Sequence, residues 1–245
     1  AANDADVLTM ASSGDAMSAA GFSITGGNTD GDSDGNLPFK ITAASGLVEV
    51  NDADDIDRET TASYTLVITV SDGTAAVTEN VVITITDIND NTPEFDDDDS
   101  DGSTATAAAS VAENSQAVGT YDGTDADSGD TLTYTIRTSG ENAASVDHDL
   151  FSIVSGSGVL TFGSAPNFEA PGCGAGNDAN TCVVVLRVSD GTNTDDITVT
   201  VTVTNVVIDI TANSANLAEN AANDADVLTM ASSGDAMSAA GFSIT

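Results

Sequence analysis

Residues 63–95 read SYTLVITVSDGTAAVTENVVITITDINDNTPEF, and this stretch decides the fold. Tyr64 to Val70 and Val81 to Thr86 are runs in which apolar, mostly β-branched side chains alternate with polar ones. Such alternation predicts β-strands that bury one face. The Ser-Asp-Gly after Val70 is typical of a turn. We therefore expect two strands that are separated by a turn.

The second half of the chain shows the same pattern, for example from Ile197 to Val203. Short alternating runs are separated by Gly, Asp, Ser and Asn, as expected of a β-sandwich. Helix signals are nearly absent, because even the Ala-rich stretch 103–110 lacks an apolar period of about 3.6 residues. The predicted fold class is all-β.

The chain repeats itself. Residues 221–245 are identical to residues 1–25, so the period is 220 residues. Val70-Ser-Asp-Gly-Thr74 recurs as Val188-Ser-Asp-Gly-Thr192, which divides each period into two related domains. Identical tandem copies indicate a linear array. We predict domain 1 over 1–91, domain 2 over 92–205 and the start of the next copy of domain 1 over 206–245.

The first strand of domain 1, equivalent to residues 206–220, falls before Ala1 in this numbering. Two explanations stay open. The chain is a window on a longer array, or the tail of one chain completes domain 1 of another by strand donation. The window is the preferred interpretation, because donation would make residues 1–25 and 221–245 compete for one place. No signal peptide opens the chain and it begins without Met, so we expect a mature chain or a fragment.

The chain is strongly acidic, with 40 Asp and Glu against 4 Lys and Arg and a formal net charge of −36. Nucleic acid and anionic membrane surfaces both require clustered basic residues, so neither is expected as a partner. No apolar run approaches the roughly 18 residues of a membrane span. Carboxylate oxygens favour Ca²⁺, which is the expected counter-charge and cofactor.

The two cysteines, Cys173 and Cys182, stand in a Gly- and Asn-rich loop. We expect a disulfide that closes this loop, which implies an oxidising, extracellular compartment. Two reduced thiols are the alternative.

The linker stretch Asp87-Ile-Asn-Asp-Asn91-Thr-Pro93 resembles the inter-domain motif of cadherins. Asp57-Arg-Glu59, Ala112-Glu-Asn114 and Asp125-Ala-Asp127 resemble other motifs of that family, in the family's order. The resemblance implies tandem Greek-key, immunoglobulin-like sandwiches. It also implies a calcium cluster where domain 1 meets domain 2. The implied ligands are Asp57, Glu59, the Ile88 carbonyl, Asn89, Asp90, the Asn91 carbonyl, Asp125, Asp127 and Asp190, with Asp130 as a substitute for a further loop ligand.

Weaker candidate metal ligands are Asp15, Asp30, Asp32, Asp34, Asp72, Glu113 and Glu169. Asp30-Gly-Asp-Ser-Asp-Gly35 resembles the start of a calcium loop, but Ile41 stands where an EF-hand requires Glu. A smaller loop site and a plain acidic turn stay open.

The second junction departs from the family pattern. Asn205-Val-Val-Ile-Asp209 replaces the linker motif, and Asn167-Phe-Glu169 replaces Asp-Arg-Glu. We expect at most one ion there, with Val206, Val207 and Ile208 holding the joint by apolar contact.

These features predict a calcium-stiffened array on the cell surface, a filament or giant adhesin whose main partners are its own neighbours. One alternative is a module that binds a surface glycan or a cell-surface protein through the loop 171–182. The other is a filament subunit that polymerises by strand donation. An enzyme is not expected, because the one histidine, His148, stands in a loop with no sign of a catalytic arrangement.

Overall fold

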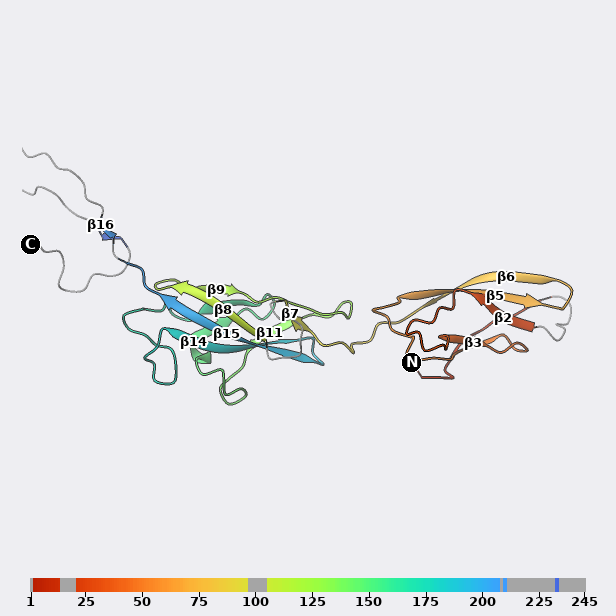
Figure 1. Ribbon diagram of the computed structural model, residues 1–245, viewed down its shortest axis with the longest axis horizontal. Coiled ribbons are helices and arrows are strands. Elements are labelled where there is room, and N and C mark those ends of the chain that lie inside the picture. Colours follow the sequence, from red (N-terminus) through yellow and green to blue (C-terminus); the bar gives the residue numbers. More distant parts are fainter. Residues whose placement is uncertain (1, 14–20, 97–104, 208, 211–231, 234–245) are drawn as a thin grey trace, which may run out of the picture. The chain divides into compact units, whose positions relative to one another are not determined.

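The computed structural model describes residues 2–13, 21–96, 105–207, 209–210 and 232–233 (Figure 1). The chain divides into two compact units, Ala1–Asn89 and Asp90–Thr245, called unit 1 and unit 2 below. The division falls two residues before the predicted boundary after residue 91. The predicted third segment, 206–245, lies mostly outside the described residues, so the predicted domain scheme stays a prediction.

The described residues of unit 1 form two antiparallel sheets of three strands. One has the order β1-β4-β3 and the other β2-β5-β6. The strands are β1 (Asp6–Thr9), β2 (Gly21–Gly26), β3 (Phe39–Ile41), β4 (Leu47–Val50), β5 (Ser63–Ser71) and β6 (Ala76–Thr84). Their inward faces form one core that includes Phe22, Phe39, Val48, Tyr64 and Leu66. The rings of Phe39 and Tyr64 meet edge to face, with their centroids 5.1 Å apart.

Unit 2 contains a four-stranded sheet with the order β11-β14-β15-β8 and a three-stranded sheet with the order β12-β13-β9. Two further pairs, β10-β7 and β16-β17, are two-stranded. The strands are β7 (Glu94–Phe95), β8 (Ala105–Ala112), β9 (Ala117–Thr120), β10 (Gly123–Thr124), β11 (Thr133–Ile136), β12 (Phe151–Ile153), β13 (Val159–Phe162), β14 (Thr181–Ser189), β15 (Thr194–Thr204), β16 (Asp209–Ile210) and β17 (Ser232–Ser233). One short 3₁₀ turn, η1 (His148–Leu150), precedes β12.

Side-chain alternation explains the core of unit 2. Along β15, Ile197, Val199, Val201 and Val203 are buried, whereas the threonines between them are half-buried or exposed. Each fully buried Val or Ile contributes about 1.5–3 kcal/mol relative to an exposed one. The all-β prediction from these runs is confirmed.

Residues 105–110 of the Ala-rich stretch that lacks a helical period belong to β8, which pairs in parallel with β15 (Figure 1). In unit 1 the strand that corresponds to β15 is β6. Among the described residues β6 pairs with β5 alone, and its Val77 and Val82 are 67% and 63% exposed. The segment equivalent to β8 in the repeat lies within 206–220, mostly outside the described residues. Strand donation therefore stays a prediction.

The two related hairpins turn in the same way. Asp72 Oδ1 accepts the N–H groups of Thr74 and Ala75, each at 2.7 Å. Asp190 Oδ1 accepts those of Thr192 and Asn193 at 2.5 and 2.6 Å. The glycine after each Asp has a φ of 90° or 100°, which a side chain would strain. The repeated Ser-Asp-Gly is thus explained by the turn itself.

The predicted disulfide between Cys173 and Cys182 is present. Both cysteines are buried in the core of unit 2. Asp147 holds both ends of the loop, because its Oδ1 accepts the N–H of Gly174 and its Oδ2 that of Val183, each at 2.7 Å. The disulfide therefore joins the loop to β14 from inside the core.

Reducing this disulfide should destabilise unit 2 by about 2–3 kcal/mol, because the short closed loop no longer restricts the unfolded chain. The measurement is hydrogen exchange in urea with and without a phosphine reductant, read on peptides from β14 and β15. Peptides from β5 are the internal control and should not change. Equal protection of β14 in both states would contradict the prediction.

Candidate metal centre

Asp127 anchors the start of unit 2. It follows β10 and is 5% exposed. Its Oδ2 accepts the backbone N–H groups of Asp90 and Asn91 at 3.0 and 2.9 Å, and its Oδ1 accepts the Asn91 side-chain amide at 2.7 Å. Hydrogen bonds to a charged acceptor contribute about 1.5–3 kcal/mol each. The residues predicted as ligands at 90, 91 and 127 are therefore brought together.

A second group of carboxylates surrounds Asp127. One carboxylate oxygen from each of Asp125, Asp127 and Asp130 lies within 4.8 Å of the others. Asp125 Oδ1 accepts the Asp127 N–H at 2.9 Å, whereas Asp125 Oδ2 is buried with no hydrogen-bond partner. A buried anionic oxygen without a partner is destabilising unless a cation neutralises it. Three hard oxygen donors fit Ca²⁺.

The β14–β15 turn contributes to the same end of unit 2. Asp190 orders this turn, and Asn193 in it donates from its side-chain amide to the Asn91 carbonyl at 2.7 Å. That carbonyl is one of the predicted ligands. The turn and the linker are thus connected by a direct hydrogen bond.

Unit 1 holds the other predicted ligands. Asp57 Oδ1 accepts the Glu59 N–H at 2.9 Å, and its Oδ2 accepts the Thr60 hydroxyl at 2.6 Å. The Thr60 hydroxyl and the Glu59 N–H lower the pKa of Asp57 below its ordinary value. This carboxylate is therefore held ionised and in a fixed position.

Glu59 is in the opposite situation. Desolvation raises its pKa, and so do a hydrogen bond and the like charge of Asp87. Asp87 is the first residue of the linker motif, but the predicted ligand set left it out. Its position at the start of the linker motif could have marked Asp87 as a candidate ligand from the sequence. Like charges that face each other in this way favour a bound cation.

The other two predicted linker ligands belong to the end of unit 1. Asn89 is the last residue of the unit, and Ile88, whose carbonyl was predicted as a ligand, has a side chain that is 63% exposed.

The weaker candidates divide into several kinds. Asp72 orders a turn, and the Ala75 and Thr74 N–H groups lower its pKa. Asp15 lies outside the described residues. Asp30 and Asp32 lie together with Asp55, a residue that sequence reasoning missed. The structure does not include Asp34 in that group.

Glu113 and Glu169 lie at the end of unit 2 that leads to residue 206. Glu113 is 2% exposed, and its two oxygens accept the N–H groups of Val206 at 2.7 Å and Phe168 at 3.1 Å. Glu169 Oε1 accepts the Asn205 side-chain amide at 2.7 Å. Both glutamates hold the chain in place at residues 205 and 206. Val207 is 78% exposed, whereas Ile208 lies outside the described residues.

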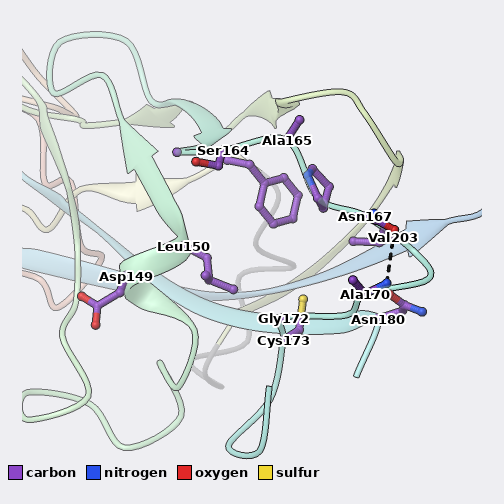
Figure 2. A pocket seen from close by; sticks show the side chains of 13 residues that line it. Asp149, Leu150, Ser164, Ala165, Asn167, Ala170, Gly172, Cys173, Asn180 and Val203 are labelled. Carbon is purple, nitrogen blue, oxygen red and sulfur yellow. Dashed lines mark hydrogen bonds between the residues drawn. The ribbon is translucent and has the colours of Figure 1, made fainter. Parts of the chain in front are cut away.

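A cavity of about 510 Å³ lies beside the disulfide loop. Figure 2 shows Asp149 and Leu150 on one side of it and Asn167, Val203 and Ala170 on the other, with Gly172 and Cys173 below. The Ala170 N–H donates to Asn167 Oδ1 at 3.2 Å, which fixes one rim. Its lining is mixed, with apolar walls and polar groups from Asp149, Asn167 and Asn180.

His148 lies in η1 and its side chain is 15% exposed, 3.4 Å from an oxygen of Asp149. His148 was expected in a loop, whereas it lies in a short 3₁₀ turn with its side chain largely covered.

Replacing Glu59 with Gln should stabilise calcium-free unit 1 at pH 7. The raised pKa means that the folded unit favours protonated Glu59, so ionisation destabilises it as pH rises through that pKa. The neutral Gln removes this effect, and the gain should disappear once acid protonates Glu59. The measurement is hydrogen exchange of β5 with a chelator at pH 7 and in acid. An equal difference at both pH values would contradict the assignment.

Comparisons with known proteins agree on one kind of domain. No family model matches the chain. A Fat-like cadherin-related tumor suppressor homolog from Drosophila melanogaster is 31% identical over 121 residues, which are 46% of this chain and 2% of the relative. The chain therefore spans a very small part of that protein.

Two solved structures have the same fold. Domains EC22–24 of mouse cadherin-23 match 75% of this chain and 52% of theirs, with a TM-score of 0.54 and 23% identity. A protocadherin gammaB7 structure of domains EC3–6 matches 80% of this chain and 44% of its own, with a TM-score of 0.57 and 20% identity. In the described part of the chain, no helix has the length and apolar character to cross a bilayer. The sequence match and the shared sandwich fold together support a cadherin-like domain.

Proposed function

We propose that this chain is a segment of an extracellular adhesive and structural array, stiffened by calcium where unit 1 leads into unit 2. The observation that carries the proposal is the carboxylate group around Asp127, which contains a buried, unpartnered oxygen on Asp125 and also fixes the linker residues Asp90 and Asn91. The cadherin-like fold supports an extracellular, adhesive setting. The net charge of −36 supports a cation as the bound species.

Both units would contribute calcium ligands at such a junction. Asp125, Asp127, Asp130, Asp190 and the linker residues Asp90 and Asn91 would hold calcium from unit 2, and Asp57, Glu59, Asp87, Ile88 and Asn89 from unit 1. Bound calcium would supply the positive charge that both sets of oxygens lack. Asp127 contributes in a second way, because its hydrogen bonds to the linker N–H groups hold residues 90 and 91 in a defined conformation.

Stiffening follows from linkage. A ligand that binds only the ordered junction stabilises it by about 2.7 kcal/mol when its concentration is about 100 times Kd. Extracellular calcium modules commonly have Kd values of about 10⁻⁴–10⁻³ M. Removing calcium would then leave carboxylates that repel one another, and the hinge would loosen.

The exact repeat of residues 1–25 at 221–245 supports a role in setting length. Identical modules extend an array without adding a new recognition surface. A surface filament or a giant adhesin would use such an array to carry a contact point away from the cell.

We further propose that the joints alternate. At the end of unit 2, Glu113 uses both carboxylate oxygens to hold backbone N–H groups, and Asn167 stands where the calcium-rich joint has Asp57. Fewer oxygens are therefore available at that joint. It would bind at most one ion and depend instead on apolar residues such as Val207.

The cavity beside the disulfide loop favours a second candidate function, the binding of a glycan or a protein segment. Its rim is fixed by the disulfide and by the hydrogen bond between Ala170 and Asn167. Fixed rims reduce the entropy lost on binding. Saccharides that shift amide resonances of residues 170–180 would support this function, and an unchanged spectrum would exclude those sugars.

Replacing Asp190 with Asn should weaken calcium binding by about tenfold or more, because one charged ligand is lost. Asp72→Asn is the matched control, since Asp72 orders the equivalent turn of unit 1 with the same pair of hydrogen bonds. The measurement is isothermal titration with Ca²⁺. Equal losses in the two variants would mean that Asp190 acts only on its turn.

Chelation should also change the shape of the chain in solution. Small-angle scattering should show a larger and better-defined maximum dimension with calcium than with chelator, since the junction is locked only when it is neutralised. The Asp127→Asn variant should show a smaller difference. Identical scattering curves of the unsubstituted chain with calcium and with chelator would contradict the proposal that calcium stiffens the junction.

The alternation of joints is testable on a chain in which residues 1–220 occur twice. It contains two junctions of the calcium-rich kind and one of the other kind. Calcium bound per chain should therefore be close to twice that of a single period. A count near three times the single period would show that all joints bind equally.

A further inference from the structure

The loop between β2 and β3 gathers three carboxylates away from the linker motif. One oxygen from each of Asp30, Asp32 and Asp55 lies within 4.8 Å of the others. Asp30 and Asp32 belong to this loop, whereas Asp55 comes from the segment between β4 and β5. All three belong to unit 1, so the group does not depend on unit 2.

Asp55 is the unusual member. It is 6% exposed, and its Oδ1 accepts the N–H groups of Gly31 and Asp32 at 2.7 and 3.2 Å. Its Oδ2 is buried and has no hydrogen-bond partner. Leaving an anionic oxygen buried in this state is costly unless a cation reaches it. The orphaned oxygen therefore points to a ligand that is independent of the clustering itself.

The position of Asp55 is fixed from behind. The hydroxyl of Tyr64 donates to the Asp55 carbonyl at 2.5 Å, and Tyr64 is itself buried against Phe39. The base of the loop is fixed as well. Asn28 donates to the Phe39 carbonyl at 2.7 Å and accepts the Phe39 N–H at 3.1 Å. These bonds preorganise the carboxylates, which reduces the ordering that a ligand must impose.

The loop also arranges its own acidic residues. Asp30 accepts the N–H groups of Ser33 at 2.6 Å and Gly35 at 2.9 Å, and this closes the loop on itself. Asp34 instead accepts the backbone and side-chain N–H groups of Asn36 at 2.7 and 2.8 Å. The sequence suggested Asp34 as the third candidate ligand beside Asp30 and Asp32. In the folded loop the third carboxylate of the group comes from Asp55 instead.

Like charges meet in this group. No salt bridge among the described residues includes Asp30, Asp32 or Asp55. The Asp34 N–H lowers the pKa of Asp32, but desolvation and the charges of Asp34, Asp55 and Asp30 outweigh it and raise that pKa. The group thus carries negative charge with no protein cation to offset it.

We propose that Asp30, Asp32 and Asp55 form a calcium site inside unit 1, separate from the junction between the units. All the donors are hard oxygens, and backbone carbonyls and water can complete the six to eight ligands that Ca²⁺ takes. Calcium fits better than Mg²⁺, which requires a near-ideal octahedron and gives up its water reluctantly. The bound ion ties the β2–β3 loop to the segment before β5.

Calcium binding to the full chain tests this site through four single substitutions. Asp55→Asn removes the charge of the buried ligand, and Asp54→Asn is the matched control, because Asp54 is its exposed neighbour with the same charge. Asp32→Asn removes an exposed ligand and leaves the core untouched. Asp127→Asn weakens the junction and should leave the unit 1 site intact.

The expected result is one calcium ion fewer per chain, or an affinity about tenfold weaker for one ion, in Asp55→Asn and in Asp32→Asn. Asp54→Asn should match the unsubstituted chain, and Asp127→Asn should lose ions while keeping this one. If Asp55→Asn fails to fold, Asp32→Asn answers the question alone. Calcium binding in Asp32→Asn equal to that in Asp54→Asn would overturn the proposal.

Terbium provides a second readout that locates the ion. Tb³⁺ prefers the same oxygen ligands, and its emission is sensitised by a nearby tyrosine. Tyr64 contacts Asp55 directly, so the Asp127→Asn chain should retain sensitised emission. The further change Tyr64→Phe should remove most of it, and it should also weaken calcium binding modestly, because the hydroxyl that fixes Asp55 is lost. Emission that is unchanged by Tyr64→Phe would overturn the proposed location.

Discussion

Carboxylates crowded together without basic partners are the constraint on which this structure depends. The chain has ten acidic side chains for every basic one. Such an excess of one sign opposes compaction. Backbone N–H groups offset part of this repulsion, because they donate to carboxylate oxygens at turns and loop bases in both units. Each such bond fixes an acidic side chain without using a lysine or an arginine.

These hydrogen bonds separate two kinds of acidic residue. Asp147 and Glu113 use both oxygens to accept backbone N–H groups, so each closes a structural contact. Asp125 and Asp55 use one oxygen in this way and keep the other buried without a partner. The first kind is complete in the protein alone, whereas the second leaves one buried oxygen without a hydrogen-bond partner, where we propose that a cation binds. Asp127 adds a third arrangement, because it accepts three N–H bonds and still lies in a carboxylate group.

The sequence predicted the parts of the fold that local patterning determines. Alternation identified β5, β15 and the last part of β6, and the loop composition identified the disulfide. The Ser-Asp-Gly repeats marked the two hairpin turns, although the structure explains them by N–H bonds to Asp72 and Asp190. The candidate ligands in the linker were predicted from the resemblance of its motif, and of the motifs around it, to those of cadherins. Asp55 could not be predicted, because it stands more than twenty residues from Asp30 and no local pattern links it to that loop. Asp87 was missed although it is part of the quoted motif, since only its contact with Glu59 brings it into the acidic group at this end of unit 1.

The short segment after β4 connects the two proposed kinds of calcium site. It carries Asp55 toward the β2–β3 loop and, two residues on, Asp57, which the Glu59 N–H and the Thr60 hydroxyl hold in place. Fixing the backbone of one residue costs about 1–2 kcal/mol of conformational entropy. An ion bound to Asp55 would already order the backbone near residues 55–57. Asp57 and Glu59 would then lose less conformational entropy when they bind their own ion. Because coupling between binding sites is reciprocal, calcium at the junction would strengthen the loop site to the same extent. Occupancy of the loop site and stiffness of the junction would then rise together as the calcium concentration increases.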